Sequence, residues 1–194
     1  MQQEHSPQQI ELYITVGDEN LSRAIDEELA LLDLDKVVKR TLEAVGITRQ
    51  VMLTLLITDD ETIRDMNKQF RQQNEATDVL SFPMLDRPLV NAPADQLWTS
   101  PEEVEGREAQ EGEKKTPAFV SPPGQVTNLG DVAISWPTLM RQANTAGHNP
   151  VYELLYLLVH GILHLVGYDD QTEAGYQAMV HLQQSVLESI GQKA

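Results

Sequence analysis

The chain has 194 residues, of which 41% are hydrophobic, a length and composition that favour a folded domain over a disordered chain. It contains no cysteine, which excludes disulfide bonds and cysteine-ligated zinc or iron–sulfur centres. The formal net charge of −16 argues against a nucleic-acid partner unless basic residues gather locally.

Up to residue 58, the sequence predicts two strands joined by helical segments. Residues 10–16 (IELYITV) alternate in character and predict a strand, and residues 51–58 (VMLTLLIT) predict a buried one. Between them, apolar residues at helical spacing predict one broken helix or two short ones, which we expect Gly46 to end. The N-terminus has no basic start followed by an apolar stretch, so we expect no secretory signal.

A helix is expected next, from about Asp59 to Gln72, followed by a third strand over Thr77–Pro83. Thr58 and Glu61 have the spacing of a capping box at the start of this helix. Its apolar face consists of Ile63, Met66 and Phe70. Pro83 should end the third strand or mark it as an edge strand, because proline donates no hydrogen bond to a sheet.

The stretch from Asp86 to Gly124 differs in character from the rest of the chain. It holds six of the ten prolines, its acidic residues outnumber its basic ones, and no periodicity persists. Such a composition predicts a flexible surface insertion. An arm that binds a partner is the alternative.

Regular structure is predicted again after this stretch. Residues 131–135 (DVAIS) predict a fourth strand, and a helix should run from about Pro137 to Ala146. Asn149 as N-cap and Pro150 in the first turn then begin a helix that is apolar on almost every side. A helix of that kind lies in a core, and Gly167 stands where its C-terminal cap belongs.

A last amphipathic helix is expected from about Thr172 to Ile190. Its candidate core residues are Tyr176, Met179, Val180, Val186, Leu187 and Ile190. About four strands and five or six helices without a regular βαβ repeat predict an α+β fold: one domain over residues 1–194, with a small mixed sheet and a metal-binding helix in the core. The apolar run Leu154–Val166 is shorter than the roughly 20 residues that cross a bilayer, so we expect a soluble, cytoplasmic protein.

Two histidines interrupt that core helix, in the stretch HGILHLVGYDD (His160–Asp170). At a spacing of four residues both imidazoles project from one helical face, and two nitrogens can reach one ion. If the helix stops at Gly167, Asp169 or Asp170 can supply a third ligand, leaving a fourth position for water. Two histidines four apart are weak evidence alone, but burying two imidazoles without partners is costly, which favours a metal site over core histidines.

Gly161 lies between the two histidines. Glycine inside a helix costs about 1 kcal/mol relative to alanine, so we expect another backbone or a substrate to pass close by. Zinc proteases of the HExxH type carry their general base, a glutamate, at this position. The glycine therefore argues against a peptidase.

Three further stretches accompany HGILHLVGYDD in a fixed order. They are MNKQFRQQNEATDVLSFP (Met66–Pro83), LGDVAIS (Leu129–Ser135) and AGHNPVYELLYLLVHG, which ends at Gly161. Together these stretches resemble the YbeY family of bacterial endoribonucleases that mature ribosomal RNA. The resemblance covers most of residues 51–83 and 129–191 and says nothing about residues 86–124.

The resemblance implies one zinc ion held by His160, His164 and Asp170, following the family pattern H-x3-H-x5-H. The family usually has histidine where this chain has Asp170. Aspartate is a harder, charged ligand, so we expect weaker Lewis acidity at bound water and tolerance of other divalent ions. Asp169 matches the family's aspartate just before the third ligand. We expect it either to hold the metal ligands in place without binding the ion or to serve as a turn or helix cap.

Arg71 matches an arginine that the family is thought to use at its active site. A guanidinium can grip a phosphate through two hydrogen bonds and stabilise charge on the transferring group. Without the resemblance, a solvated charge at a helix C-terminus would be the simpler interpretation. With Lys68 and the ion, Arg71 is expected to form a local basic groove despite the acidic composition.

The implied function is a metal-dependent, single-strand-specific endoribonuclease acting in ribosomal RNA maturation, at the 16S 3′ end, and in ribosome quality control. The implied partners are single-stranded RNA and the ribosome or its small subunit with associated proteins, and no membrane. The alternatives are a metal-dependent peptidase and a non-catalytic ribosome-assembly factor with a structural metal. His148 is expected either to approach the site or to be solvated, and His181 to lie on a helix surface.

Overall fold

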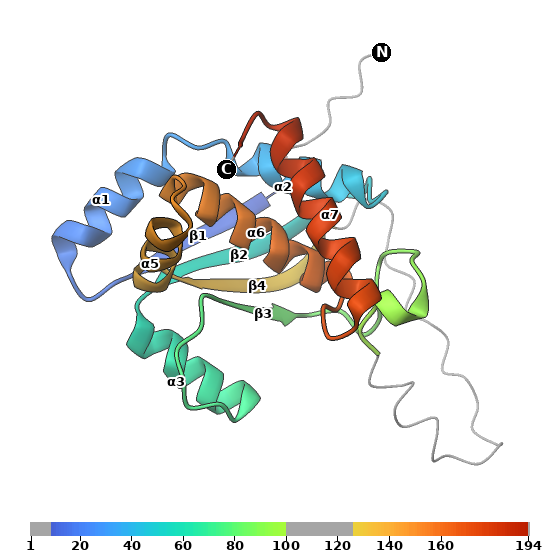
Figure 1. The fold of residues 1–194 in the computed structure, drawn as a ribbon, viewed down its shortest axis with the longest axis horizontal. Coiled ribbons are helices and arrows are strands. Elements are labelled where there is room, and N and C mark those ends of the chain that lie inside the picture. The colour runs from blue at the N-terminus through green and yellow to red at the C-terminus, as the bar shows by residue number, and fades with distance from the viewer. Residues whose placement is uncertain (1–8, 100–125, 194) are drawn as a thin grey trace.

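The structure is a computed structural model that describes residues 9–99 and 126–193, and its centre is a four-stranded mixed sheet (Figure 1). The strands are β1 (Gln9–Thr15), β2 (Val51–Thr58), β3 (Val79–Pro83) and β4 (Thr127–Ser135). Their spatial order is β1-β2-β4-β3, with the first three parallel and β3 antiparallel to β4 at the edge. The predicted mixed sheet and the edge position of the strand that ends at Pro83 are confirmed.

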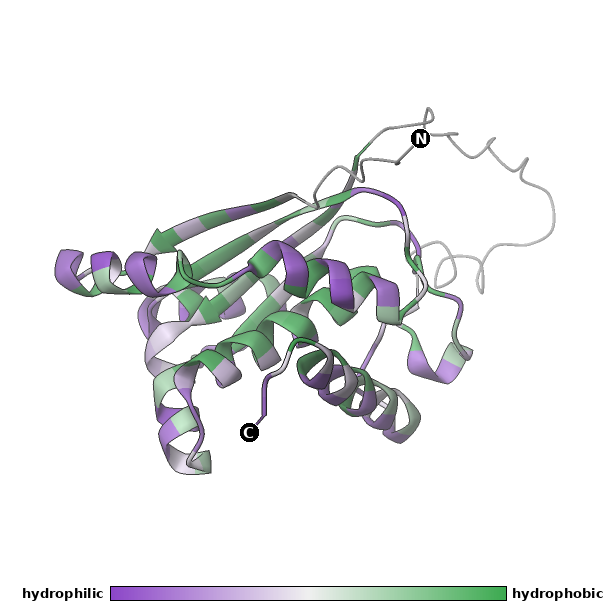
Figure 2. Ribbon diagram, turned by 90° about the horizontal axis from the view of Figure 1, so that it is seen from above, coloured by the Kyte–Doolittle hydropathy of each residue, from purple (hydrophilic) through white to green (hydrophobic). Residues whose placement is uncertain are grey.

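Six α-helices and one short 3-10 helix accompany the sheet in the described part of the chain. They are α1 (Glu19–Leu29), α2 (Leu34–Ala44), α3 (Asp60–Arg71), η1 (Ala94–Gln96), α5 (Trp136–Ala146), α6 (Pro150–Val166) and α7 (Glu173–Ser189). α6 packs against β3 and β4 on one side and contacts α2, α5 and α7 on the other. Figure 2, seen from above, shows most helices on one side of the sheet, with hydrophobic residues along the strands and α6. The expected α+β class is confirmed.

The two faces of the sheet are covered unequally, as β2 illustrates. Its alternate residues Val51, Leu53, Leu55 and Ile57 are fully buried and belong to the main hydrophobic core. On the opposite face α3 forms a smaller cluster, in which Ile63 packs with Leu80 and Ala133. Burial alternates along β2 with a period of two, which directs one set of its side chains toward α6 and its neighbours.

α6 begins and ends where the sequence predicts. The Asn149 side chain accepts a hydrogen bond from the Val151 amide, Pro150 occupies the first turn, and Gly167 follows the helix with a φ of 132°. Eleven of the 17 residues of α6 are buried and the others are partly buried, so the helix lies in the core as expected. No single helix among the described residues is long and apolar enough to cross a membrane, although α5 and α6, bent by 117°, satisfy that test by length and composition as a pair.

Two local predictions are wrong. The N-cap of α3 is Asp59, whose side chain accepts from the Thr62 amide at 2.8 Å, whereas Thr58 ends β2 and its hydroxyl donates to the Thr15 carbonyl. Strand pairing therefore uses the threonine that the capping-box spacing had assigned to the helix. Tyr176 is 50% exposed rather than part of the core.

The first part of the predicted flexible insertion, residues 86–99, is packed against the rest of the fold. The Leu89 amide donates to the Val166 carbonyl at 2.8 Å, Val90 is buried, and Leu97 forms an antiparallel bridge with Tyr168. Residues 86–99 are thus packed against the end of α6, and the remainder of the predicted insertion, residues 100–124, lies outside the described residues.

Candidate metal centre

α6 presents His160 and His164 from the same helical face, one turn apart. Their ring centroids are 4.6 Å apart and their Nε2 atoms 3.0 Å apart. Both rings are largely shielded from solvent, with side-chain exposures of 21% and 19%. The i, i+4 spacing therefore brings together the two nitrogens that the sequence proposed as ligands.

Gly161 lets α6 approach the sheet closely at this level. A methyl group added there would lie 2.6 Å from Val132 Cγ1 and 3.3 Å from Ser81 Oγ. The expected close neighbour exists, but it consists of strand side chains rather than another backbone or a substrate. Because Gly161 is buried against β4 and β3, this position offers no room for the glutamate base of an HExxH protease.

The turn after α6 brings Asp170 back toward the two histidines. Asp170 Oδ2 lies 3.8 Å from His160 Nε2 and 3.9 Å from His164 Nε2, and its side chain is 38% exposed. In the described part of the chain, these three residues form the one group of three or more His, Asp or Glu side chains close enough to share an ion. Two ligands about 2.0–2.1 Å from a tetrahedral ion lie roughly 3.3 Å apart, so small shifts would complete such a site.

Asp169, the other candidate for the third ligand, has a different role in the turn. Its Oδ1 accepts a hydrogen bond from the Gln171 amide at 3.2 Å, and its own amide donates to the Gln96 carbonyl at 2.9 Å. These bonds are those of a turn-forming aspartate. Of the alternatives proposed for Asp169, the turn is the one that its hydrogen bonds support.

The tautomer of a neutral His164 ring follows from its hydrogen-bond partner. Its Nδ1 lies 2.9 Å from the Tyr168 carbonyl oxygen, which can only accept a hydrogen bond. The neutral ring therefore carries its proton on Nδ1, and Nε2 faces His160 and Asp170 with a lone pair. A lone pair directed at a carboxylate and a second imidazole suits a cation, which makes this donor set chemically fit for a divalent metal ion.

Burial keeps His160 in the form that a ligand requires. Desolvation, followed by the nearby His164, lowers the pKa of His160 below its usual value, while Asp170 and a hydrogen bond with Gln183 oppose the shift. The net direction favours the neutral imidazole, and only a deprotonated nitrogen can bind a metal ion.

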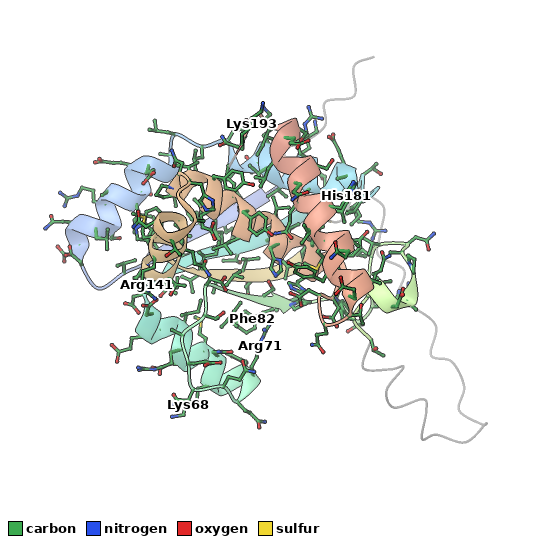
Figure 3. The ribbon with its side chains drawn as sticks, in the orientation of Figure 1. Lys68, Arg71, Phe82, Arg141, His181 and Lys193 are labelled. Atoms are coloured by element: carbon green, nitrogen blue, oxygen red, sulfur yellow. The ribbon has the colours of Figure 1, made fainter. Side chains whose placement is uncertain are left out.

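The three candidate ligands open into a cavity of about 680 Å³. Its walls come from the end of α3, from β3, from Trp98, from α6 and from the turn that follows α6. The lining residues are Arg71, Gln73, Thr77, Asp78, Val79, Ser81, Pro83, Trp98, His160, His164, Asp169, Asp170 and Gln171. Figure 3 shows Arg71 between α3 and β3, whereas Lys68 lies on the side of α3 that faces away from the sheet. Arg71 is exposed and forms no ion pair among the described residues.

The expected basic groove is wrong for the described residues. Lys68 does not line the cavity, and Arg71 is the one described cationic side chain that does, beside Asp78, Asp169 and Asp170. Without a bound cation the cavity therefore has an acidic lining, so recognition of a phosphate there would depend on Arg71 and the charge of the ion.

Comparison with known proteins identifies the family. The sequence matches the family model described as "Endoribonuclease YbeY" over residues 15–191. The chain belongs to the YbeY family of endoribonucleases. This membership confirms the resemblance seen in the four sequence stretches and the expectation of an RNA-cleaving hydrolase.

Relatives named Endoribonuclease YbeY are similar over most of their length. One from Dehalococcoides mccartyi is 36% identical and covers 81% of this chain and 85% of its own. Others from Moorella thermoacetica (32%, covering 91% and 96%) and Desulforamulus reducens (36%, covering 89% and 94%) match more of the chain. Among solved structures, the solution structure of TM1509 from Thermotoga maritima matches 92% of this chain and 87% of its own, with 19% identity and a TM-score of 0.48.

Trp98 is a cavity residue that sequence reasoning missed. It lies in the part of the chain that the YbeY resemblance does not cover, and its indole Nε1 donates to the His164 carbonyl at 2.9 Å. Its backbone amide donates to Gly167 at 3.0 Å, so the segment around Trp98 clamps the turn between α6 and Asp170. The apolar residues of this segment, Leu89, Val90, Leu97 and Trp98, were the available signal within an otherwise polar stretch.

His148 neither approaches the candidate ligands nor lies free in solvent. Its Nε2 is 2.5 Å from Glu153 Oε2, and the two side chains are only 15% and 10% exposed. His148 also contacts the Tyr152 ring and is absent from the cavity lining. It therefore secures the start of α6 through Glu153, while His181 is exposed on α7 as expected.

Proposed function

We propose that this protein is a metal-dependent endoribonuclease that cleaves single-stranded RNA during the maturation of ribosomal RNA, including the 16S 3′ end, and in ribosome quality control. The observation that carries the proposal is the convergence of His160, His164 and Asp170 in a cavity that also includes Arg71. Membership of the YbeY family supports RNA as the substrate. We further propose that the chain forms one domain, with a proline-rich, acidic insertion at about residues 86–124.

In the proposed site His160, His164 and Asp170 hold one divalent ion, with zinc as the first candidate. The ion would supply Lewis-acid chemistry, by polarising a phosphoryl oxygen or by making water a better nucleophile near neutral pH. Two neutral imidazoles and one carboxylate leave room for one further ligand. Because Asp170 is anionic where relatives usually have histidine, the site should be less selective for zinc over harder divalent ions.

Arg71 is proposed to bind the phosphate and to stabilise charge that develops on it. A guanidinium is always protonated and can donate two parallel hydrogen bonds to phosphate oxygens. Its exposed position at the cavity and the lack of an ion pair among the described residues leave those donors available. One such donor directed at a developing oxyanion contributes about 10²–10³-fold in rate.

Substrate binding is proposed to depend on the ribosome. The net charge of −16 and the acidic cavity lining oppose tight binding of free RNA by the isolated chain. A ribosomal precursor would present the cleavage site locally and compensate for weak intrinsic affinity. This proposal places the protein in the cytoplasm with the small ribosomal subunit.

The experiment combines metal analysis with RNA cleavage. Protein purified without added ions is analysed for bound metal and incubated with matched single-stranded and double-stranded oligoribonucleotides, beside His164→Ala. We expect about one ion per chain and cleavage of the single strand, both lost in His164→Ala. Products ending in a 2′,3′-cyclic phosphate would assign the attack to the ribose hydroxyl, and products ending in a 3′-hydroxyl would assign it to water.

Two results would redirect the proposal. Cleavage of unstructured peptides but not RNA by the metal-loaded protein would identify a peptidase. Chelation that unfolds the protein, together with normal ribosomal RNA maturation in cells that carry Arg71→Glu, would identify an assembly factor with a structural metal.

A further inference from the structure

Ser81 is a buried polar residue whose hydroxyl forms no hydrogen bond with any described residue. Aromatic residues aside, seven buried residues in the described part of the chain carry polar or charged side chains: Thr41, Thr58, Asn67, Ser81, Ser135, Glu153 and Gln183. The other six use their side chains in hydrogen bonds within the fold, whereas Ser81, at 8% exposure, does not. Burying a hydroxyl without a partner costs free energy, so its surroundings indicate what it serves.

The surroundings of Ser81 are those of the candidate metal centre. It lies in the middle of β3, whose alternate residues Val79, Ser81 and Pro83 all line the metal cavity. A methyl group added at Gly161, the residue that follows His160, would lie 3.3 Å from Ser81 Oγ. Strand alternation therefore places this hydroxyl on the metal side of the sheet, at the level of the histidines.

Close packing explains a small side chain at position 81 but not a hydroxyl. Gly161 and Val132, the partner of Ser81 across β4, leave little room there, and alanine would fit at least as well as serine. Ser135 shows what a buried serine does for the fold, because its hydroxyl donates to Asp60 Oδ1 at 2.5 Å. The Ser81 hydroxyl has no such task among the described residues, so it is available to a molecule in the cavity.

We propose that Ser81 is a substrate-binding residue, whose hydroxyl donates a hydrogen bond to an oxygen of the RNA phosphate that Arg71 and the ion also bind. This inference rests on the proposed function and adds a neutral donor from β3 to the charged groups on α3 and α6. Serine hydroxyls are common donors to nucleic-acid phosphates.

A neutral donor suits the charges of this cavity. Three aspartates line it, together with Arg71 as the one described cationic side chain. A second guanidinium or ammonium group would be attracted to those carboxylates as well as to a phosphate. A hydroxyl carries no charge, so it forms no ion pair with the aspartates and remains available to the substrate.

The test pairs Ser81→Ala with a matched control, Ser135→Ala, which is the same substitution in a buried serine on the neighbouring strand. Cleavage of a single-stranded oligoribonucleotide is measured at equal Zn²⁺ occupancy, and urea unfolding is measured on the metal-free proteins. We expect Ser81→Ala to cleave about 10–100-fold more slowly, the effect of losing a hydrogen bond to a charged group, with an unchanged or higher urea midpoint. Ser135→Ala should show the reverse, a lower urea midpoint and unchanged cleavage by the folded protein.

Phosphate binding is measured separately from cleavage. Inorganic phosphate is titrated into the Co²⁺-loaded proteins while the visible absorption of the ion is followed. Ser81→Ala should bind phosphate about 10-fold more weakly than Ser135→Ala, because it lacks one donor to the anion.

Three outcomes overturn the inference. If Ser81→Ala cleaves RNA at the rate of the unmodified protein, or binds phosphate as tightly as the control, the hydroxyl contacts only water. If its urea midpoint falls as far as that of Ser135→Ala, or if it does not fold, the hydroxyl has a structural role. Failure of the proposed function looks different, because RNA would then remain uncut by the unmodified protein while phosphate affinity still depends on Ser81.

Discussion

The Nδ1 atom of His164 lies 2.9 Å from the carbonyl oxygen of Tyr168, so the last turn of α6 is tied directly to the turn that follows it. This bond links a histidine on a rigid helix to the loop that carries Asp170. Loss of order in the turn would therefore disturb both the hydrogen bond of His164 Nδ1 and the distance from His164 Nε2 to the Asp170 carboxylate.

Replacing Asp170 tests the third ligand. Asp170→Asn should weaken Zn²⁺ affinity by more than about 100-fold, since loss of a ligand should exceed the 10–100-fold effect of losing a supporting partner. Asp170→His should keep Zn²⁺ and reduce binding of Mn²⁺, because imidazole is a softer ligand. Metal content after dialysis against each ion measures both effects. Asp169→Asn is the control, and a larger loss there than at Asp170 would exchange the two roles.

Arg71 should affect catalysis without affecting metal content. Arg71→Glu is expected to reduce RNA cleavage at least 10²-fold, because it removes the phosphate donor and adds repulsion. Lys68→Glu makes the same charge change on α3 outside the cavity and should reduce cleavage only slightly. Both variants are assayed at equal metal occupancy. Equal losses in the two would mean that net charge, rather than a specific contact, governs the rate.

Trp98→Phe tests whether the hydrogen bonds of Trp98 constrain the turn between α6 and Asp170. It removes the hydrogen bond from Nε1 to the His164 carbonyl while keeping an aromatic ring, and should lower the free energy of unfolding by about 1 kcal/mol. Urea denaturation of the metal-free protein measures this change. We also expect weaker Zn²⁺ binding, because the turn loses one of its tethers. Unchanged stability together with unchanged Zn²⁺ affinity would show that the clamp does not constrain the site.

Acid should weaken the junction between α3 and α5 through Asp60. Desolvation raises the pKa of Asp60, but hydrogen bonds from Ser135, Arg141 and Thr138 outweigh it and lower that pKa below its usual value. Asp60 Oδ2 lies 2.9 Å from Arg141 Nη1, and Oδ1 accepts from the hydroxyls of Ser135 and Thr138 at 2.5 and 2.7 Å. A carboxyl with a lowered folded-state pKa stabilises the fold above its unfolded pKa, and that contribution disappears as the pH falls through the folded value.

The corresponding measurement is urea unfolding between about pH 6 and pH 3. The unmodified protein should lose stability below about pH 4, the ordinary aspartate range. Asp60→Asn should be less stable by about 1–2 kcal/mol at neutral pH and lose less on acidification. Asp65→Asn, whose side chain is 69% exposed, is the control. Parallel pH curves for Asp60→Asn and the unmodified protein would contradict this assignment.

Local pattern predicted the elements well where backbone and side-chain preferences agree. β2 was predicted over its full length because its residues form a short, nearly continuous apolar run, and α6 because Asn149, Pro150 and Gly167 mark its ends. The spacing of His160 and His164 likewise needs only helical geometry. Arg71 became a candidate only through resemblance, because nothing in its local sequence distinguishes it from Lys68.

The parts that could not be predicted depend on contacts between distant segments. Trp98 lies in a proline-rich, acidic stretch, and its contact with His164 spans 66 positions. In the sequence Gln183 is an ordinary polar residue of an amphipathic helix. Its burial, at 1% exposure, results from the packing of α7 against α6. Thr58 fitted a capping box by spacing, but its hydroxyl was already used in pairing β2 with β1.

The gap between the α6 backbone at Gly161 and the side chains of Val132 and Ser81 is too narrow to hold a methyl group. The height of the two histidines above the sheet is consequently set by the size of residues on β4 and β3. Redesign that adds bulk at position 161 would have to begin by trimming Val132, and the two positions should change together or not at all as the sequence diverges.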